Sequence, residues 1–307
     1  MGSPKLGRTQ GLVEDEIVER IRGTLGGGIE AFGLRDDAAL VEMTGEGPLV
    51  VSVDSVVAGV HFDLSWCSPA DVGWKALMGA LSDLAAMGAR PLGALVALCV
   101  PDGELAVGVT GGVAEASALS GCPVLGGDVS AASELMVAVT VMGTVDGGEP
   151  VTRQGAEGGD ALWLTGPCGG SAAGLRNRGG AAYQRPLARL AEGTQARLGG
   201  ARAMIDVSDG LALDLHRLAD RSGVGFRLEA AAVPVSEGAT LEEALGGGED
   251  YELLMAVAEG DAGDLVRRFE GAGLRRPWRI GTCTADAGVR VLDGEPLGRL
   301  GWQHPVG

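Results

Sequence analysis

The sequence predicts an α/β protein of two domains, because of its length, its composition and two successive series of strand-like and helix-like segments. The chain has 307 residues, which is more than one typical domain and enough for each half to bury a core. Its 46% apolar and 21% charged residues are typical of a globular protein and argue against disorder. A turn-rich stretch at residues 146–150 separates the two series. We therefore expect an N-terminal domain over residues 1–145 and a C-terminal domain over residues 146–307.

The first series alternates strands and helices. One strand is rich in β-branched residues and is bounded by Pro48 and Gly59. One helix follows Ser68, a good N-cap, and Pro69, a good first helical residue, and its apolar residues recur at spacings of three and four. The expected elements are strands at 49–57, 92–100 and 134–145 and helices at 70–87 and 104–119.

The second series repeats this α/β pattern without a detectable sequence repeat. Leu211, Leu215 and Leu218 lie on one face of an expected helix. The expected elements are strands at 161–165, 203–206, 225–230, 251–258 and 278–283 and helices at 171–176 and 209–221.

Charge and apolar patterning exclude several classes of partner. The formal net charge is −17 and no basic run offsets it, which argues against nucleic acid. A polyanionic substrate would be repelled unless metal ions bridged it to the carboxylates. No apolar run reaches the ~20 residues of a membrane span, and the N-terminal residues lack the apolar core of a signal peptide. We expect no membrane association and a cytoplasmic location.

Cysteine usage agrees with a reducing compartment. The cysteines are odd in number, far apart and without a C-x-x-C pair, so they indicate neither a disulfide framework nor a zinc site. We expect buried thiols at these positions, which are Cys67, Cys99, Cys122, Cys168 and Cys283.

Familiar nucleotide-binding motifs are missing. The chain has only two lysines, Lys5 and Lys75, and neither lies in a P-loop. The sequence also lacks H-R-D, D-F-G and a G-x-G-x-x-G after a strand. If ATP binds, it binds to another fold.

Short acidic clusters beside small residues or glycines recur along the chain, at residues 35–37, 52–54, 82–83, 126–128 and 206–209. Any single exposed Asp is more often a solvated turn residue than a ligand. Their repeated occurrence on what we expect to be glycine-framed turns instead suits several Mg²⁺ ions between polyphosphates, since a hard cation takes oxygen ligands. The clusters predict a phosphoryl-transfer enzyme.

An ordered set of motifs resembles the thiamine-monophosphate kinases over nearly the whole chain. The motifs are Asp36-Asp37-Ala38-Ala39, Asp54-Ser55 with Gly59-Val60-His61-Phe62, Lys75 with Leu81-Ser82-Asp83-Leu84-Ala85-Ala86-Met87-Gly88-Ala89, Gly126-Gly127-Asp128, Arg153 with Gly155-Ala156, Ile205-Asp206-Val207-Ser208-Asp209-Gly210-Leu211 and Gly248-Glu249-Asp250-Tyr251-Glu252-Leu253. The superfamily includes aminoimidazole ribonucleotide synthetase. The resemblance implies an N-terminal domain that dimerises into a β-barrel flanked by helices, and a C-terminal α/β domain that completes the nucleotide and substrate site.

The resemblance also implies roles for individual residues. The Mg²⁺ ligands would be Asp37, Ser52, Asp54, Asp83, Asp128 and Asp206, with Asp209 more peripheral and the backbone carbonyl of Val53 available. The contacts to ATP would come from Gly127, Asp128, Arg153 and Ser208, and those to thiamine monophosphate from His61, Glu249 and Trp302. Without the resemblance, Arg153 would equally suit a surface ion pair and Trp302 a packed tail residue.

The implied reaction is ATP-dependent, Mg²⁺-assisted, in-line phosphorylation of thiamine monophosphate to thiamine diphosphate. No general base is expected, because the acceptor is already an anionic phosphate oxygen. Two residues depart from the family pattern: Arg35 replaces a Gly and Val53 replaces a Thr. Two alternatives stay open: a superfamily member acting on a carbonyl or carbamoyl oxygen, and a nucleotide-binding homologue with impaired catalysis.

A homodimer is expected from the resemblance. The strands around Val51 and Val139 would also leave exposed sheet edges in a monomer, which proteins usually cover.

Overall fold

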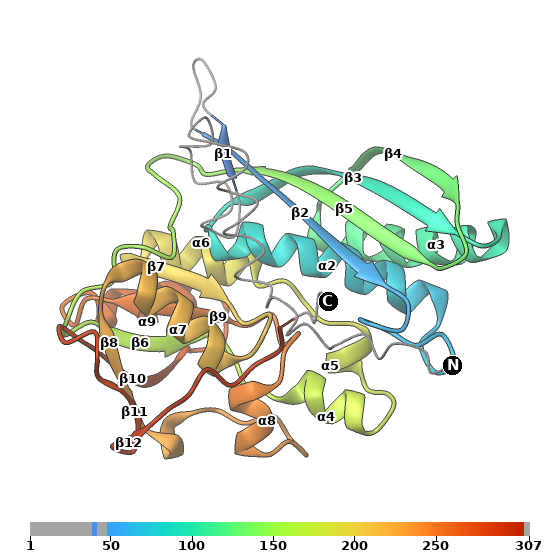
Figure 1. The fold of residues 1–307 in the computed structure, drawn as a ribbon. Helices are drawn as coiled ribbons and strands as arrows, with labels where there is room; N and C mark the ends of the chain where they lie inside the picture. The colour runs from blue at the N-terminus through green and yellow to red at the C-terminus, as the bar shows by residue number, and fades with distance from the viewer. Residues whose placement is uncertain (1–38, 42–47, 304–307) are drawn as a thin grey trace, which may run out of the picture.

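The computed structural model describes residues 39–41 and 48–303, which form two sheets backed by helices (Figure 1). Within these ranges, the N-terminal elements are β1 (Ala39–Val41), β2 (Leu49–Val57), α2 (Pro69–Ala86), β3 (Arg90–Val100), α3 (Gly103–Ser120), β4 (Val124–Ala131) and β5 (Met136–Thr144). The strands form one sheet in the order β1-β2-β5-β3-β4, antiparallel except for the parallel pair of β3 and β4.

Helices α2 and α3 cover one face of the N-terminal sheet (Figure 1). Helix α2 begins as expected, because Ser68 and Asp71 form a reciprocal capping box and Pro69 opens the first turn. The two helices pack closely where they cross, since a Cβ on Gly112 would lie 1.7 Å from the carbonyl oxygen of Ala70. Leu77, Leu81 and Leu84 of α2 then pack with the buried valines of β5 in one core.

The remaining elements form a second sheet and its helices. They are β6 (Ala161–Leu164), α4 (Gly170–Arg176), α5 (Ala181–Gln184), α6 (Leu190–Leu198), β7 (Ala201–Asp206), α7 (Leu211–Ser222), β8 (Gly225–Leu228), η1 (Ala230–Ala232), α8 (Leu241–Gly246), β9 (Leu253–Val257), α9 (Ala262–Gly271), β10 (Trp278–Thr284), β11 (Arg290–Leu292) and β12 (Glu295–Pro296). The strand order is β12-β11-β8-β10-β6-β9-β7.

Helix α2 also packs against the second half of the chain. Ala85 and Ala86, at its C-terminal end, share a core cluster with Val151, Met204 and Leu253. Figure 1 shows α2 between the N-terminal sheet and the elements of the C-terminal half. Residues on the second face of this helix are therefore buried between the two sheets.

The expected strands and helices of both series are found in the structure, with ends shifted by a few residues. The sequence did not reveal strand β4, which contains Gly126, Gly127 and Asp128. A glycine-rich strand with every residue exposed has low strand propensity and no apolar alternation, and only its pairing with β3 makes it a strand. Helices α5, α6, α8 and α9 and strands β11 and β12 were missed as well.

The acidic residues lie mostly within strands and helices, so the general expectation of glycine-framed turns is wrong. Ser52 and Asp54 lie within β2, Asp83 within α2, and Asp206 ends β7, as the expected elements over these residues imply. Asp128, for which no element was expected, lies within β4. Asp37 and Arg35 lie outside the described residues.

The edge argument for a dimer was also wrong. Val139 lies on β5, which is paired on both sides, by β2 and by β3. Val51 is paired on both sides too, with Ala39 of β1 and Met142 of β5. The edges of the N-terminal sheet, as far as the structure describes it, are β4, β1 and the part of β2 beyond β1. Neither sheet closes on itself within residues 39–41 and 48–303, so these residues do not form a β-barrel in a single chain.

The outer face of the N-terminal sheet carries exposed apolar side chains. The strand register places Val53, Leu95 and Thr140 side by side on the face opposite α2 and α3. Val53 is 66% and Leu95 is 43% exposed. A sheet face of this kind is usually covered in the native assembly.

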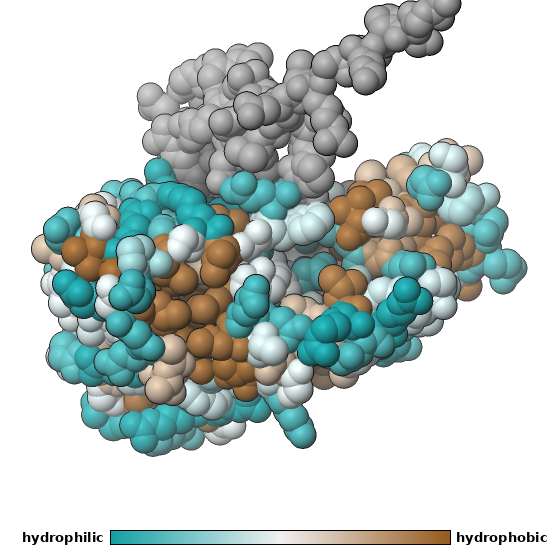
Figure 2. Space-filling model, turned by 60° about the horizontal axis from the view of Figure 1, so that its bottom comes forward, coloured by the Kyte–Doolittle hydropathy of each residue, from teal (hydrophilic) through white to brown (hydrophobic). Residues whose placement is uncertain are grey.

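Apolar surface is also visible elsewhere. Figure 2 shows a brown patch framed by hydrophilic residues on a turned view of the molecule.

No helix in the described ranges is both long and apolar enough to span a membrane. Among the cysteines, four are buried as expected, whereas Cys99 is half-buried.

Candidate active site

A cavity of about 480 Å³ is lined by residues of both halves of the chain. Strand β2, helix α2 and the loop after β2 supply one side, and the segments after β7 and before β9 supply another. It brings together many of the residues that the sequence singles out: Asp54, His61, Asp83, Asp206, Ser208, Asp209, Glu249 and Trp302. Positions up to 248 residues apart in sequence thus line one site.

Serine hydroxyls orient two of the aspartates. Ser52 Oγ donates to Asp83 Oδ2 over 2.5 Å, and Ser82 Oγ donates to Asp206 Oδ2 over 2.6 Å. Each bond joins two different elements, β2 to α2 and α2 to β7. Asp206 is only 2% exposed, so its carboxylate depends on such a donor. The pair of bonds fixes both carboxylates relative to helix α2.

Arg217 neutralises part of the acidic charge near Asp209. Its guanidinium forms ion pairs with Asp209 and, at 2.9 Å, with Asp214. Asp214 in turn accepts the backbone N–H groups of Asp209 and Gly210 and so shapes the turn after Ser208. Burial and the Asp209 carboxylate raise the pKa of Asp214, and Arg217 opposes that rise. The charge of Asp209 is therefore partly compensated by the protein itself.

Helix α2 allows Asp54 and Tyr251 to approach it closely at Gly79. A Cβ on Gly79 would lie 3.1 Å from both Asp54 Oδ2 and the Tyr251 hydroxyl. Burial, followed by the surrounding carboxylates, raises the pKa of Tyr251 well above its usual value, so this hydroxyl stays neutral. Tyr251 lines the cavity beside Asp54.

The segment before β9 has a strained backbone. Glu249 and Tyr251 adopt positive φ angles of 63° and 51°. Their N–H groups bond to the carbonyls of Ser208 and Val207, at 2.7 and 2.9 Å. These bonds offset strain of order 1–3 kcal/mol per residue. Backbone strain of this kind concentrates at functional sites, and it fixes the Glu249 side chain at the cavity.

Asp250, between the strained residues, binds the start of α4. Its carboxylate accepts the backbone N–H groups of Gly169, at 2.6 Å, and Ser171, at 3.1 Å. Gly169 is the N-cap of this helix, and the Asp250 carboxylate occupies the backbone N–H groups at the start of α4.

Two of the residues expected at the substrate are tied to the surrounding structure. Glu249 pairs with Lys75 at 2.7 Å, and Val57 donates its backbone N–H to Nδ1 of His61. Trp302 is half-exposed and lines the cavity, held there by a bond from its backbone N–H to the carbonyl of Asp209.

Several expected site residues do not line the cavity. Ser52 lies behind Asp83, and the Val53 side chain points to the outer face of the sheet. Asp128 is paired with Ala97 and shares its face of the sheet, whereas Asp54 is paired with Val139 on the helix face. Arg153 is half-buried, and its carbonyl accepts a bond from Ser222.

Gly127 has a structural explanation of its own. A Cβ at this position would lie 1.9 Å from the carbonyl oxygen of Val96, so the β3–β4 pairing itself requires a glycine there.

Sequence reasoning assigned no role to Lys75, Gly79, Ser82 or Tyr251. Each lies inside a motif that the sequence singles out. The available signal was the polar pattern along α2, where residues 75, 79 and 82 recur at spacings of four and three.

The carboxylates of this cavity suit a hard cation that takes some of its ligands from the protein and the others from water and a phosphate substrate. Within the described ranges, no three His, Cys, Asp or Glu side chains gather closely enough to form a metal site by themselves. Mg²⁺ commonly uses one or two carboxylates and completes its shell with waters and phosphate oxygens. Asp54, Asp83 and Asp206 on one cavity fit that mode of binding.

Comparison with known proteins places the chain in a family. Residues 35–145 match the family model of AIR synthase related protein, N-terminal domain, and residues 157–294 match the corresponding C-terminal domain. Thiamine-monophosphate kinase of Mycobacterium tuberculosis H37Rv is 36% identical over 96% of this chain and 92% of its own length. The chain belongs to the thiamine-monophosphate kinase family. The Escherichia coli K12 enzyme of that name is also 36% identical, over 89% of this chain and 90% of its own length.

The fold agrees with this family. The solved structure of AaThiL complexed with AMPPCP and TMP has a TM-score of 0.85 and 29% identity, and the match covers 98% of this chain and 100% of that chain.

Substitution of Ser82 by Ala tests the bond between α2 and β7. We expect Ser82→Ala to lower the free energy of unfolding by about 1–3 kcal/mol, because it removes the Ser82 hydrogen bond to the buried Asp206 carboxylate. Chemical denaturation followed by circular dichroism measures the change.

A matched control is Ser130→Ala, which removes a 3.0 Å bond to the exposed Asp128. We expect a loss within about 0.5 kcal/mol there. Equal losses for the two variants would show that Ser82 does not stabilise a buried carboxylate.

Proposed function

We propose that this protein transfers the γ-phosphoryl group of ATP to thiamine monophosphate, giving thiamine diphosphate and ADP. The observation that carries the proposal is a single cavity in which Asp54, Asp83 and Asp206 lie together with Glu249 and Trp302. Family membership favours this reaction over that of a superfamily member acting on a carbonyl or carbamoyl oxygen. Among the neighbours, AaThiL was solved with AMPPCP and TMP bound together.

The acidic part of the cavity fits the phosphate groups. Mg²⁺, when bound, would neutralise the phosphate charges and align the reacting oxygens. We propose Asp54, Asp83 and Asp206 as its ligands from this chain. Asp209, already paired with Arg217, is a peripheral ligand in this scheme. Ser52 and Ser82 hold the carboxylates in place through their hydroxyl groups.

No residue of the cavity needs to remove a proton. The attacking atom of a phosphomonoester is already an anionic oxygen, so positioning and charge compensation are sufficient. The buried Tyr251 hydroxyl stays neutral and is suited to donate a hydrogen bond rather than to accept a proton.

The other part of the cavity suits the thiamine group. Trp302 offers an aromatic face to a cationic thiazolium or a pyrimidine ring. Glu249 offers a carboxylate, and His61 lies beside it. Ser208 also lines this cavity, and we propose that it contacts ATP. The proposed ATP contacts of Gly127, Asp128 and Arg153 require the nucleotide to extend beyond this cavity. Asp37 and the carbonyl of Val53 stay proposed metal contacts.

A homodimer formed through the outer face of the N-terminal sheet is also proposed. Two such faces packed together would bury Val53 and Leu95 and could join two open sheets into a barrel. We propose a cytoplasmic location as well, since the cysteines are free thiols and a reducing compartment keeps them so.

The first test is turnover. With ATP, Mg²⁺ and thiamine monophosphate, we expect thiamine diphosphate and ADP in equal amounts, detected by chromatography. Excess EDTA should abolish both products, because the phosphates then lack their counter-charge. Free thiamine, which lacks the anionic acceptor oxygen, should yield no phosphorylated product. Absence of diphosphate from folded protein at saturating Mg²⁺ would refute the proposed function.

Asp54→Asn should reduce kcat by more than about tenfold, which corresponds to about 1.4 kcal/mol of barrier. The substitution removes the charge of a proposed metal ligand but keeps its size. Asp63→Asn, an exposed carboxylate in the loop after β2, is the control and should keep normal turnover. If both variants turned over within about threefold of wild type, Asp54 would not be a primary ligand.

Leu95→Glu should convert the dimer to monomers in sedimentation velocity at micromolar concentration. The substitution places a charge on β3, beside the central strand β5 of the proposed interface, where burial without a partner is costly. Val107→Glu on α3, where Val107 is 70% exposed, is the matched control and should sediment as wild type. A wild-type protein that is monomeric under these conditions would contradict the proposed dimer.

A further inference from the structure

We propose that Lys75 is a positioning residue that sets the affinity for thiamine monophosphate. It holds in place His61, Tyr183 and Glu249, which line the part of the cavity where this substrate is proposed to bind, called the acceptor end below. The inference rests on the proposed function. Lys75 lies on α2, is 1% exposed and does not itself line the cavity. It acts through the residues that do.

One ammonium group holds three separate segments. Lys75 Nζ donates to Glu249 Oε2 at 2.7 Å and to the carbonyl oxygen of His61 at 3.0 Å. It also lies 3.7 Å from the centroid of the Tyr183 ring. These partners belong to the segment before β9, to the loop after β2 and to α5, and all three line the cavity. An ammonium has three N–H donors, and here it meets a carboxylate, a carbonyl and an aromatic face.

Tyr183 closes the arrangement. Its hydroxyl donates to the same His61 carbonyl at 2.7 Å, and its ring centroid lies 5.0 Å from that of Trp66. Lys75, Tyr183 and the His61 backbone therefore form a ring of contacts, to which Glu249 is attached through its ion pair with Lys75. A shift of any one of these residues would therefore displace side chains that line the acceptor end.

A buried lysine is energetically unfavourable at a position that only has to fill space, because its charge loses contact with water. Burial disfavours its charge and lowers its pKa, and the Glu249 carboxylate opposes that shift. A buried ion pair adds little net stability, whereas removal of one of its partners is strongly destabilising. Removal of Lys75 would take away the 2.7 Å ion pair that orients Oε2 of Glu249. Glu249 is one of the two residues of its segment with a strained, positive φ angle. This strained backbone conformation and the ion pair with Lys75 together orient the Glu249 side chain.

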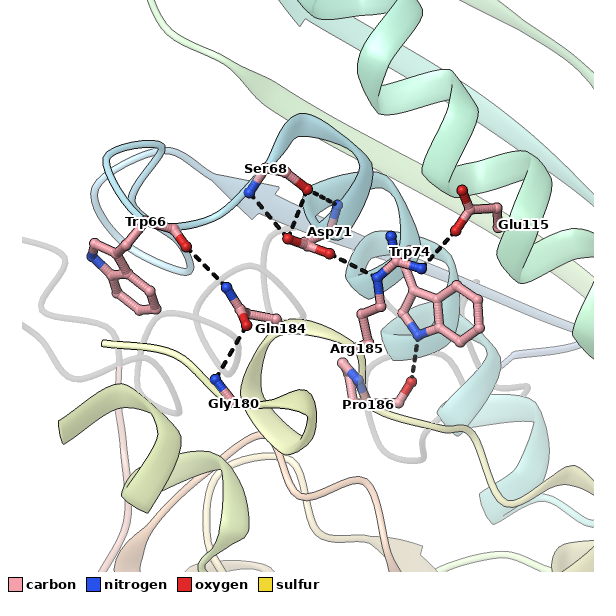
Figure 3. A network of polar contacts seen from close by, with 9 residues as sticks. All are labelled: Trp66, Ser68, Asp71, Trp74, Glu115, Gly180, Gln184, Arg185 and Pro186. Atoms are coloured by element: carbon pink, nitrogen blue, oxygen red, sulfur yellow. Dashed lines mark hydrogen bonds and ion pairs between the residues drawn. The ribbon is translucent and has the colours of Figure 1, made fainter. Parts of the chain in front are cut away.

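The α5 segment is attached to the N-terminal half by a second, separate network (Figure 3). Arg185 bonds Asp71 at 2.7 Å and Glu115 at 2.6 Å, and Trp74 Nε1 donates to the carbonyl of Pro186 at 2.7 Å. Gln184 donates to the carbonyl of Trp66 at 2.9 Å. Arg185 does not line the cavity. Substitution of Arg185 therefore loosens the segment without removing any partner of Lys75.

The experiment compares Lys75→Met with wild type in steady-state kinetics and in calorimetric titration with thiamine monophosphate in the presence of AMPPCP and Mg²⁺. We expect the KM and the Kd for thiamine monophosphate to rise by about tenfold or more, while the KM for ATP changes by less than about twofold. Equal changes for both substrates, or no change in either, would overturn the inference.

Coupling to Glu249 separates positioning from general loosening. If Lys75 acts through Glu249, the Lys75→Met/Glu249→Gln double variant should bind thiamine monophosphate no more weakly than the worse single variant. Additive losses would show that the two residues act independently. Arg185→Gln is the control that loosens the same α5 segment from outside. It should lower the melting temperature without a selective rise in the KM for thiamine monophosphate, and a rise matching that of Lys75→Met would assign the effect to the segment rather than to Lys75.

Tyr183→Phe provides a milder variant if Lys75→Met does not fold. It removes only the hydroxyl bond to His61 and keeps the ring beside Lys75, so we expect a selective rise of about threefold in the Kd for thiamine monophosphate. An unchanged Kd would contradict the proposed ring of contacts. Because the titration does not depend on turnover, wild-type protein that binds thiamine monophosphate but forms no diphosphate would refute the proposed function while still testing Lys75.

Discussion

Helix α2 packs against both halves of the chain, and the candidate active site depends on the contacts of its two faces. Its leucines pack into the core of the N-terminal sheet. Its other face presents Lys75, Gly79, Ser82 and Asp83 toward the second half of the chain, where Lys75 and Ser82 are almost completely buried. Polar groups buried in this way need partners with good geometry. Those partners, Glu249 and Asp206, belong to the C-terminal sheet and its loops, so the contacts that join the two halves also build the cavity.

A cluster of carboxylates is the second constraint, because the chain carries a net charge of −17. The protein compensates only part of the local charge. Arg217 pairs with Asp209 and Asp214, while Asp83 and Asp206 receive serine hydroxyls, which orient a carboxylate without neutralising it. Arg217 thus offsets charge at Asp209 and Asp214, whereas the serine hydroxyls orient Asp83 and Asp206, the carboxylates proposed to bind Mg²⁺.

Much of the fold was predictable because local sequence and tertiary context agree. The strand at Leu49–Val57 and the helix at Pro69–Ala86 have strong propensities, caps and periodicity. The ordered motifs also indicated Asp54, Asp83, Asp206 and Glu249, which the fold brings to one cavity. Strand β4 and the α5 segment were not predictable, since neither has a periodic apolar pattern. Tyr183 and Arg185 are fixed by partners up to 122 residues away in sequence, such as His61. Likewise, Asp128 occupies the face of the sheet away from Asp54 because of pairing register, which no local signal reveals.

The burial of Lys75 has a consequence for chemical labelling. Only two lysines occur in the chain, and Lys75 is ion-paired and 1% exposed. An acylating reagent needs an accessible, unprotonated amine, so Lys75 reacts only when α2 and the segment before β9 separate. The rate of its acylation, followed by peptide mass spectrometry, therefore reports how often the two halves of the protein open, without any probe being introduced into the site.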